Sequence, residues 1–395
     1  MKLLNTTIKG AIALSFITSS ALYATNGDTL IGVGAKTRAM GGAGIALSQG
    51  AESTLVNPAL ITDVAETEIS FGGTIFMPTV KTQMSPVEHK SAADLSIIPG
   101  VAIASQVAPN TYVGVGMWGT AGMGTDFKKH PDLFKMETTL QLMQFAVPVA
   151  YKFGNGLSVG IAPIMQYGSL DIHYQMPAMM GGMNVGDGQN QDLGYGVSVG
   201  ATYDFQNGLK VGAVYKSKIS MDYAHSLTAA TAPFGLNFGD KLDQPAEIGI
   251  GVSFNHGPHT IAVDYKKIKW GSAAGYKDFG WKDQNVFAVG YEYNAGKWAI
   301  RAGFNHAKNP LTIYNSPMKT AVDMFNLLGF PATAENHLSL GGSYEFNKNF
   351  SMDATVVYGF NKKSSADVSA MFGPGAKITN KHAELGLSVQ LNYKF

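Results

Sequence analysis

The sequence predicts an all-β protein, a 14-stranded antiparallel transmembrane β-barrel plugged by an N-terminal hatch. Three observations lead to this fold class. Many segments alternate between apolar and polar residues, which is the period of two that a strand with two different faces requires. The connections between these segments alternate between short and long, and the first 24 residues resemble an export signal.

The N-terminus has the composition of a secretory signal peptide. Lys2 and Lys9 precede a short apolar run at 10–17, and small residues follow it. The run is shorter than the ~20 apolar residues of a membrane-spanning helix. We therefore expect export, with cleavage after Ala24 or alternatively after Ala21, and no transmembrane helix in the mature chain. The predicted organisation is a signal peptide at 1–24, a hatch at 25–64 and a barrel at 65–395.

Fourteen segments show the alternation of a half-buried strand. They are 66–78, 95–108, 111–124, 139–153, 156–174, 190–205, 208–224, 243–255, 258–270, 283–294, 297–307, 334–346, 349–363 and 381–395. Tight turns rich in Asn and Gly follow the even-numbered segments, whereas longer connections follow the odd-numbered ones, up to 26 residues at 308–333. A soluble sandwich has no reason to sort its loops in this way, but an outer-membrane barrel does.

The two faces of each strand agree with a barrel in lipid. The last strand presents Leu385, Leu387, Val389, Leu391, Tyr393 and Phe395 on one side, and its other side is polar or small. The terminal Phe395 resembles the signal by which the barrel assembly machinery recognises its substrates. We expect a Gram-negative outer-membrane location, contact with outer-membrane lipid and lipopolysaccharide, and a monomer.

Residues 25–64 contain no convincing strand, yet they are too apolar for a solvated tail. Leu30, Ile31, Met40, Ile45 and Leu60 are examples. We predict that this segment packs inside the lumen as a plug. A water-filled porin is disfavoured for the same reason.

Composition excludes other classes of function. The net charge of +1 argues against a nucleic-acid partner, and the absence of cysteine removes thiolate metal sites and Cys nucleophiles. His256 and His259 flank a tight turn without an apparent third metal ligand, and we find neither a G-x-S-x-G nucleophile elbow nor an H-E-x-x-H motif. We expect no metal, no cofactor and no enzyme. An outer-membrane enzyme acting on lipids is the alternative from another class.

Several stretches resemble one known family. "GAKTRAMGGAGIAL…VNPALIT" at 34–62, "VGVGMWGTAGMGTDF" at 113–127 and "ENHLSLGGSYEFNKNF" at 335–350 are similar to FadL- and TodX-type outer-membrane transporters of long-chain fatty acids and aromatic hydrocarbons. The resemblance implies capture at outer loops, passage past a hatch and lateral release through a gap at the third strand. The matching hatch motif is Asn57, Pro58 and Ala59, and the matching kinked strand carries Gly114, Gly116, Gly119, Gly122 and Gly124.

The third strand also fits G-x-G-x-x-G at 114–119, but a dinucleotide site needs a turn and a helix there. Glycines within one strand favour a kink or a close backbone approach instead. We therefore assign these glycines to a lateral gate and not to a nucleotide.

Candidate substrate residues face the predicted lumen or cap it. Strand alternation directs Arg301, Lys216 and Lys218 into the lumen, and it places Glu292 diagonally near Arg301. These charges are either structural or ligands for a carboxylate. Met176, Met179, Met180, Met324, Phe325 and Leu328 lie in apolar outer loops. These loops either pack on themselves or capture greasy ligands.

Together these patterns favour passive transport of hydrophobic molecules. Long-chain fatty acids are the first choice, and aromatic or aliphatic hydrocarbons by the same route are the alternative. Each buried CH₂ contributes ~0.8 kcal/mol, so a sixteen-carbon tail is worth on the order of 10 kcal/mol. An exposed ion pair adds only ~1 kcal/mol. The tail therefore dominates binding.

Overall fold

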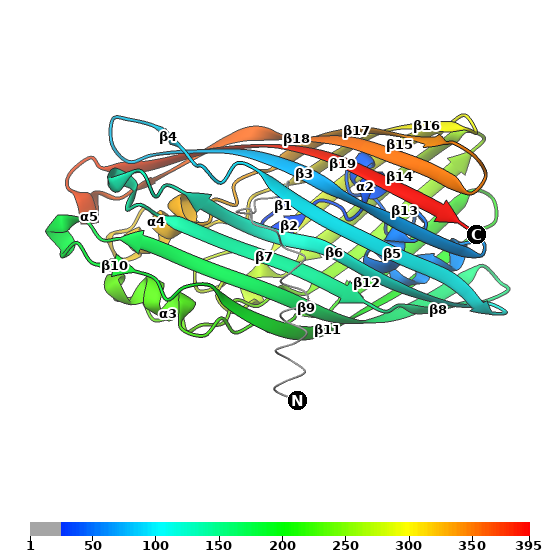
Figure 1. Cartoon of the computed structure of the whole chain (residues 1–395), viewed down its shortest axis with the longest axis horizontal. Coiled ribbons are helices and arrows are strands. Elements are labelled where there is room, and N and C mark those ends of the chain that lie inside the picture. The colour runs from blue at the N-terminus through cyan, green and yellow to red at the C-terminus, as the bar shows by residue number, and fades with distance from the viewer. Residues whose placement is uncertain (1–24) are drawn as a thin grey trace.

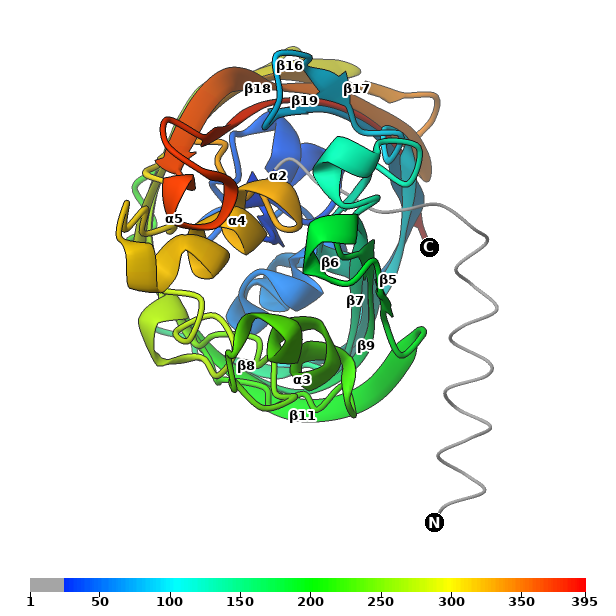
Figure 2. The same cartoon turned by 90° about the vertical axis from the view of Figure 1, so that its left-hand side faces the viewer.

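The protein is a closed antiparallel barrel of 14 strands, as predicted (Figures 1 and 2). The computed structural model describes residues 25–395, the side chain of Met179 excepted, so the expected signal peptide at 1–24 lies outside the described residues. The wall strands in chain order are β3 (Thr67–Gln83), β5 (Ser96–Ala108), β6 (Thr111–Asp126), β7 (Glu137–Ala146) continued by β8 (Val149–Lys152), β9 (Leu157–Gln175), β11 (Asn190–Asp204), β12 (Leu209–Lys216), β13 (Glu247–His256), β14 (His259–Ile268), β15 (Gln284–Asn294), β16 (Trp298–Ala307), β17 (Asn336–Glu345), β18 (Phe350–Asp367) and β19 (Lys377–Lys394).

The fourth wall strand is interrupted between β7 and β8 at Val147 and Pro148. Proline has no backbone N–H to donate to the ladder, so the pairing breaks at this point. The backbone bonds from Val147 N to Pro163 O and from Gly114 N to Pro148 O keep the neighbouring strands in place. β7 and β8 therefore act as one strand of the wall.

The barrel closes where β19 pairs with β3, with Leu385 opposite Met77. Lipid cannot form hydrogen bonds with the backbone groups of an open sheet edge, and closure removes that edge. Along β13 the apolar Ile248, Ile250 and Val252 are exposed on the outside, and the glycines and Ser253 between them are buried on the inside. The alternation in the sequence therefore separates a lipid face from a lumen face.

Short and long connections lie at opposite ends, as the sequence predicted. The tight turns use positive φ, as at Asn110 (60°), Gln206 (59°) and Gly257 (58°). The long connections carry β4 (His89–Lys90), β10 (Asn184–Val185), α3 (Ser226–Thr231), α4 (Thr320–Leu328) and α5 (Ser369–Phe372), which gather at the left of Figure 1. We call this the outer end, because outer-membrane barrels have their long loops outside.

Two neighbouring predicted strands extend too far into the connection between them. β12 ends at Lys216 instead of residue 224, and β13 begins at Glu247 instead of residue 243. The chain between them leaves the wall and folds over the lumen, with only the isolated bridges from Ile219 to Gln244 and from Asp222 to Lys241. Alternation persists in this stretch because its apolar residues are buried within the loop.

Aromatic residues form a band at the tight-turn end. Ring pairs two residues apart recur at four strand ends, with centroid distances of 4.8 Å for Tyr151 with Phe153, 4.8 Å for Tyr203 with Phe205, 5.2 Å for Tyr344 with Phe346 and 5.0 Å for Tyr393 with Phe395. Amphipathic rings prefer the level of the lipid headgroups. The band therefore marks one membrane interface.

Residues 25–64, the N-terminal segment, lie inside the barrel (Figure 2). The segment contains β1 (Thr25–Asn26), β2 (Thr29–Leu30), α2 (Ala35–Ala39) and the 3-10 helices η1 (Glu52–Leu55) and η2 (Pro58–Asp63). Most of its apolar side chains are buried, and Ile31, Met40 and Leu60 are fully so. Among residues 25–395, no helix has the length and apolar character needed to cross a bilayer.

Candidate functional site

Polar groups of the barrel wall hold the N-terminal segment. Asp264 of β14 accepts hydrogen bonds from Gly44 N at 2.7 Å and Ile45 N at 2.9 Å. On the opposite side of the lumen, Gln390 of β19 accepts from Ala35 N at 3.0 Å. These bonds satisfy buried backbone groups that the irregular segment cannot pair internally. The segment is therefore fixed by side chains of the wall.

The Asn57-Pro58-Ala59 motif forms the start of η2. The Asn57 side chain accepts from Ala59 N at 3.1 Å and donates to Ile45 O at 2.8 Å, while Pro58 occupies the first helical position. A Cβ at Gly200 of β11 would lie 1.9 Å from Asn57 Oδ1, and one at Gly160 of β9 would lie 2.5 Å from Pro58 C. The motif is therefore a capped turn packed against wall glycines.

The wall is incomplete between β5 and β6. These strands pair from Gly100 with Trp118 to Ala108 with Thr111, but within the described chain β6 has no partner on β5 beyond Trp118. The pairing of β6 with β7 has a register shift between Gly119 and Ala121, which leaves Thr120 out of the ladder. Residues 119–125 of β6 therefore border a gap in the wall, where β5 does not pair with them. We call this gap, together with residues 119–125, the window.

The N-terminal segment fills the window. Thr29 of β2 pairs with Ala121, and Gly122 N donates to Asp28 O at 3.0 Å. At the outer edge, Ser91 and Ala92 bond to Asp126 and close the gap. Backbone groups that would normally pair with a neighbouring strand therefore pair with a segment that is not part of the wall.

The candidate gate glycines have different surroundings. A Cβ at Gly116 would lie 2.3 Å from Thr54 Oγ1, and one at Gly114 would lie 2.9 Å from Thr54 Cγ2. A Cβ at Gly119 would lie 2.7 Å from Ile98 Cγ2, and one at Gly124 would lie 2.1 Å from Thr138 O. Gly114 and Gly116 thus admit the N-terminal segment, whereas Gly119, Gly122 and Gly124 lie in the window, with Gly124 against β7.

Asp28 links the segment at the window to an outer loop. Its buried carboxylate accepts hydrogen bonds from the Tyr276 hydroxyl and from Gln244 Nε2, the latter at 3.3 Å. Burial raises the pKa of Asp28 from 3.8 to about 6, although these hydrogen bonds oppose the rise. Burial also raises the pKa of Tyr276 far above its usual range.

A cavity of about 50 Å³ lies between the N-terminal segment and the wall. Its apolar lining consists of Leu30, Ile31, Val33, Ile45, Leu55, Val56 and Val214, and it also reaches Thr120 and Ala121 at the window. A second cavity, of about 10 Å³, lies on the other side of residues 30–33 against Trp118 and Gly119. One water molecule occupies ~10–15 Å³ of such a cavity. The two cavities therefore have room for a few waters at most, and neither holds a large apolar ligand in this conformation.

Two lysines face the larger cavity. Lys216 of β12 and Lys266 of β14 line it with Glu247 of β13, and Glu247 is in register with Lys216. Within residues 25–395 neither lysine ammonium forms an ion pair or a hydrogen bond. An unpaired ammonium beside apolar side chains provides a point charge suited to a carboxylate. Lys218 differs, because it lies beyond β12 and pairs with Asp243 at 2.8 Å.

Arg301 lies near the tight-turn end and already has partners. Its Nε is 2.5 Å from Glu292 Oε2, and its Nη1 is 2.5 Å from Ser343 Oγ and 3.8 Å from Asp353 Oδ1. Glu292 is directly opposite Arg301 in the ladder, so the predicted diagonal placement was wrong. Lys36 of the N-terminal segment reaches Asp353 at 3.9 Å. This network favours the structural interpretation over carboxylate capture.

The outer loops cover the lumen with an apolar cluster. Met324, Phe325 and Leu328 of α4 are buried, and the Phe325 ring lies 5.4 Å from the Phe234 ring. Met176 is also buried and Met180 is partly buried. The helix is tied to the third strand, because Thr125 Oγ1 donates to Leu328 O at 2.8 Å. The loop cluster and the outer part of β6 are therefore in direct contact.

His256 and His259 are opposite each other in the ladder beside a tight turn. Among the described residues, neither belongs to a group of three potential metal ligands. His259 Nδ1 instead lies 2.7 Å from the Tyr291 hydroxyl.

Sequence reasoning missed Lys266, Glu247, Asp28 and Tyr276. Lys266 shares its face with Asp264, so strand parity could have placed both in the lumen. No local pattern marks the contact of Asp28 with Tyr276, because 248 residues separate them in the chain.

Comparisons with known proteins agree with this architecture. The model of the family described as "Outer membrane protein transport protein (OMPP1/FadL/TodX)" matches residues 11–395. The 47 kDa outer membrane protein of Pasteurella multocida is 22% identical over 351 residues, which cover 79% of this chain and 82% of that protein.

Two solved structures share the fold. The structure of a Pseudomonas aeruginosa FadL homologue has a TM-score of 0.73 and 14% identity, with 93% of this chain and 100% of the other covered. The P. putida toluene transporter TodX has a TM-score of 0.69 and 16% identity, with 92% and 99% covered.

Proposed function

We propose that this chain, which belongs to the OMPP1/FadL/TodX family of outer membrane transport proteins, carries long-chain fatty acids passively across the outer membrane. Family membership makes it a transport protein of hydrophobic substrates and not an enzyme. The observation that carries the route is the window between β5 and β6, which the N-terminal segment occupies and which adjoins the larger cavity.

The proposed route begins at the apolar cluster of the outer loops. A tail that enters among the side chains around Phe325 leaves water for an apolar environment, so entry is favourable. The route continues to the cavity between the N-terminal segment and the wall, and it ends at the window. Release through the window into lipid never returns the tail to water.

The N-terminal segment acts as the hatch in this proposal. The cavity of about 50 Å³ is too small for a long tail, so residues 29–33 must move before a substrate passes. Movement breaks the pairing of Thr29 with Ala121 and the bond from Gly122 N to Asp28 O. The same residues close both the lumen and the wall, so one movement of the N-terminal segment opens both.

The two unpaired lysines at the cavity support an acidic head group. Lys216 and Lys266 approach the cavity from two wall strands, with Glu247 between them. A carboxylate there would gain two charge-assisted contacts, each worth ~1.5–3 kcal/mol in a partly buried setting. A neutral hydrocarbon would gain none.

Uptake of aromatic or aliphatic hydrocarbons is the second candidate. The mostly apolar lining of the cavity favours it, and one structure that shares this fold is a toluene transporter. Both candidates use the same route and differ only in the role of the lysines.

The test compares uptake of labelled oleate and of toluene by a host that lacks its own transporter. We expect wild type to restore oleate uptake, and the double variant Lys216→Met/Lys266→Met to lose about a hundredfold or more for oleate and little for toluene. Lys267→Met is the matched control, because Lys267 lies on the other face of β14 and pairs with Asp283 at 3.8 Å. Uptake of toluene alone would select the second candidate, and uptake of neither would reject the transport proposal.

A further inference from the structure

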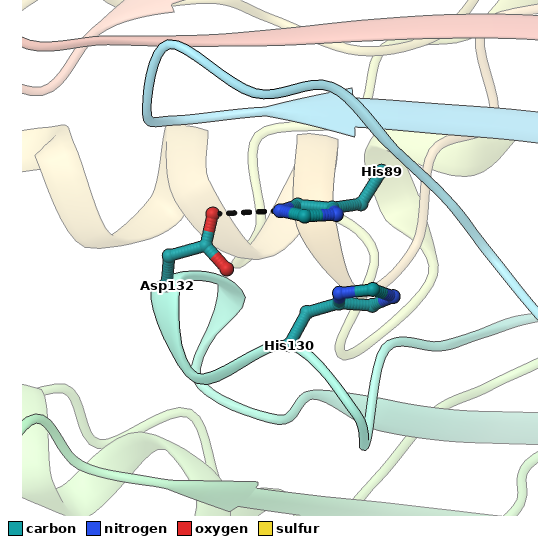
Figure 3. Close-up of side chains that lie close together, drawn as sticks. All are labelled: His89, His130 and Asp132. Atoms are coloured by element: carbon teal, nitrogen blue, oxygen red, sulfur yellow. Dashed lines mark hydrogen bonds and ion pairs between the residues drawn. The ribbon is translucent and has the colours of Figure 1, made fainter.

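Two histidines and an aspartate meet where the first two long connections approach each other (Figure 3). His89 belongs to β4 in the connection between β3 and β5. His130 and Asp132 flank Pro131, which starts the 3-10 helix η3 (Pro131–Leu133) between β6 and β7. The backbone of this turn is fixed, because Leu133 N and Lys135 N both donate to His130 O at 3.0 Å.

The three side chains are close to the spacing of metal ligands. His89 Nε2 lies 3.0 Å from Asp132 Oδ2, and one ligand atom from each of the three residues lies within 4.8 Å of the others. Tetrahedral ligands at ~2.0–2.1 Å from zinc are separated by about 3.3 Å. The 3.0 Å between His89 Nε2 and Asp132 Oδ2 is close to this separation, and a rotation of the His130 side chain would supply the third ligand.

The ring nitrogens of His130 have no hydrogen-bond partner among the described residues. The ring stacks on His89 with a centroid distance of 4.0 Å and an interplanar angle of 28°. Stacking holds the two imidazoles with the same side facing Asp132 (Figure 3). A polar ring held in this position without a hydrogen-bond partner suits a ligand that the two loops share.

Asp132 is oriented by a supporting contact. Ser85 Oγ donates to Asp132 Oδ2 at 2.8 Å, as outer groups commonly do for a ligating carboxylate. Partial burial opposes ionisation, but the hydrogen bond from Ser85 and the contact with His89 hold the pKa of Asp132 below its usual value. The side chains of His89 and Asp132 are 19% and 33% exposed, so an ion in solution can reach them.

We propose that His89, His130 and Asp132 bind one divalent transition-metal ion, with water at the remaining position. Two imidazoles and a carboxylate suit zinc, copper, nickel or iron, whereas calcium and magnesium prefer all-oxygen sites. The ion would join the two long connections on either side of the β5–β6 hairpin. The same connections close the outer edge of the window through Ser91, Ala92 and Asp126, so the ion clamps that edge.

Binding is tested with Zn²⁺ alone, by calorimetry on the mature, chelator-treated protein in detergent. We expect one ion per chain, with affinity reduced at least tenfold in His130→Gln and in Asp132→Asn. The matched control is His256→Gln/His259→Gln, which removes the histidine pair at the other end of the barrel and should leave the affinity unchanged. Absence of Zn²⁺ binding, or loss of binding in the control instead, would overturn the proposal.

A second readout tests the clamp. Zn²⁺ should slow proteolysis within the connection at 127–136 in wild type and not in His130→Gln. Heat-modifiable gel mobility of each variant shows that its barrel is folded. Equal protection of both proteins by Zn²⁺ would contradict a shared ion at these loops.

Discussion

A disulfide between the N-terminal segment and β6 should lock the window. Thr29 and Ala121 are in register across the β2–β6 pairing, and opposite residues in antiparallel strands have Cα atoms ~4.5–5.5 Å apart. This separation is within the range that a disulfide spans. The chain has no cysteine of its own, so Thr29→Cys/Ala121→Cys can form one intramolecular bridge only.

The contacts that the lock makes permanent are modest in wild type. Opening breaks the backbone bond from Gly122 to Asp28 and the side-chain bonds from Tyr276 and Gln244 to the Asp28 carboxylate. Neutral hydrogen bonds contribute ~0.5–1.5 kcal/mol and those to a charged group ~1.5–3 kcal/mol, for a total of about 5 kcal/mol. At ~1.4 kcal/mol per factor of ten, the segment leaves the window about once in several thousand molecules without substrate.

Oleate uptake by cells expressing the double-cysteine variant, with and without a reductant, measures the effect. Oxidation should reduce uptake by more than tenfold, because the bridge prevents the segment from leaving the window. Reduction should restore uptake, because the segment can then leave the window as it does in wild type. Leu340→Cys/Val356→Cys is the matched control, since these residues are in register on two wall strands away from the window. Unchanged uptake by a variant that mass spectrometry shows to be fully oxidised would refute the role of the window.

Three further perturbations test other parts of the reasoning. Asp28→Asn should remove the pH dependence of uptake between pH 4 and 7. The raised pKa of about 6 makes docking of the N-terminal segment at the window about 3 kcal/mol stronger below pH 3.8 than above pH 6. A variant that keeps the wild-type pH profile would count against this. Arg301→Ala should lower the free energy of unfolding by about 3 kcal/mol, since it leaves Glu292 without its cation and Asp353 with Lys36 alone, yet affect oleate and toluene uptake equally. A selective loss of oleate uptake would restore the capture role. Deletion of residues 25–64 should produce steady conductance in planar bilayers, and a silent barrel would contradict the plug.

The wall could be predicted because each strand reports its own environment. Lipid requires an apolar residue at every second position, so Ile248, Ile250 and Val252 identify β13 without reference to any other part of the chain. Tight turns are equally local, since Asn110 and Gly257 supply the positive φ that a short hairpin needs.

The candidate site could be predicted only in part, because its contacts join distant residues. Strand parity placed Lys216 in the lumen, but it could not show that Arg301 is paired with carboxylates on two strands while Lys216 forms no ion pair within the described chain. Parity also failed at Ile219, where an apolar alternation marks a loop that packs on itself. Similarly, nothing local shows that β5 stops pairing with β6 at Trp118.

In the proposed route, the energies at the window account for transport without an external source of energy. The N-terminal segment is held there by about 5 kcal/mol of polar contacts, whereas a sixteen-carbon tail transferred from water is worth on the order of 10 kcal/mol. A tail that enters the lumen can therefore displace residues 29–33, and about six methylenes at ~0.8 kcal/mol each already match the contacts that they replace. Once the tail has left into lipid, the unpaired backbone groups of Ala121 and Gly122 face an environment that cannot satisfy them. That penalty returns the segment to the window, so the same hydrogen bonds that delay opening also drive closure.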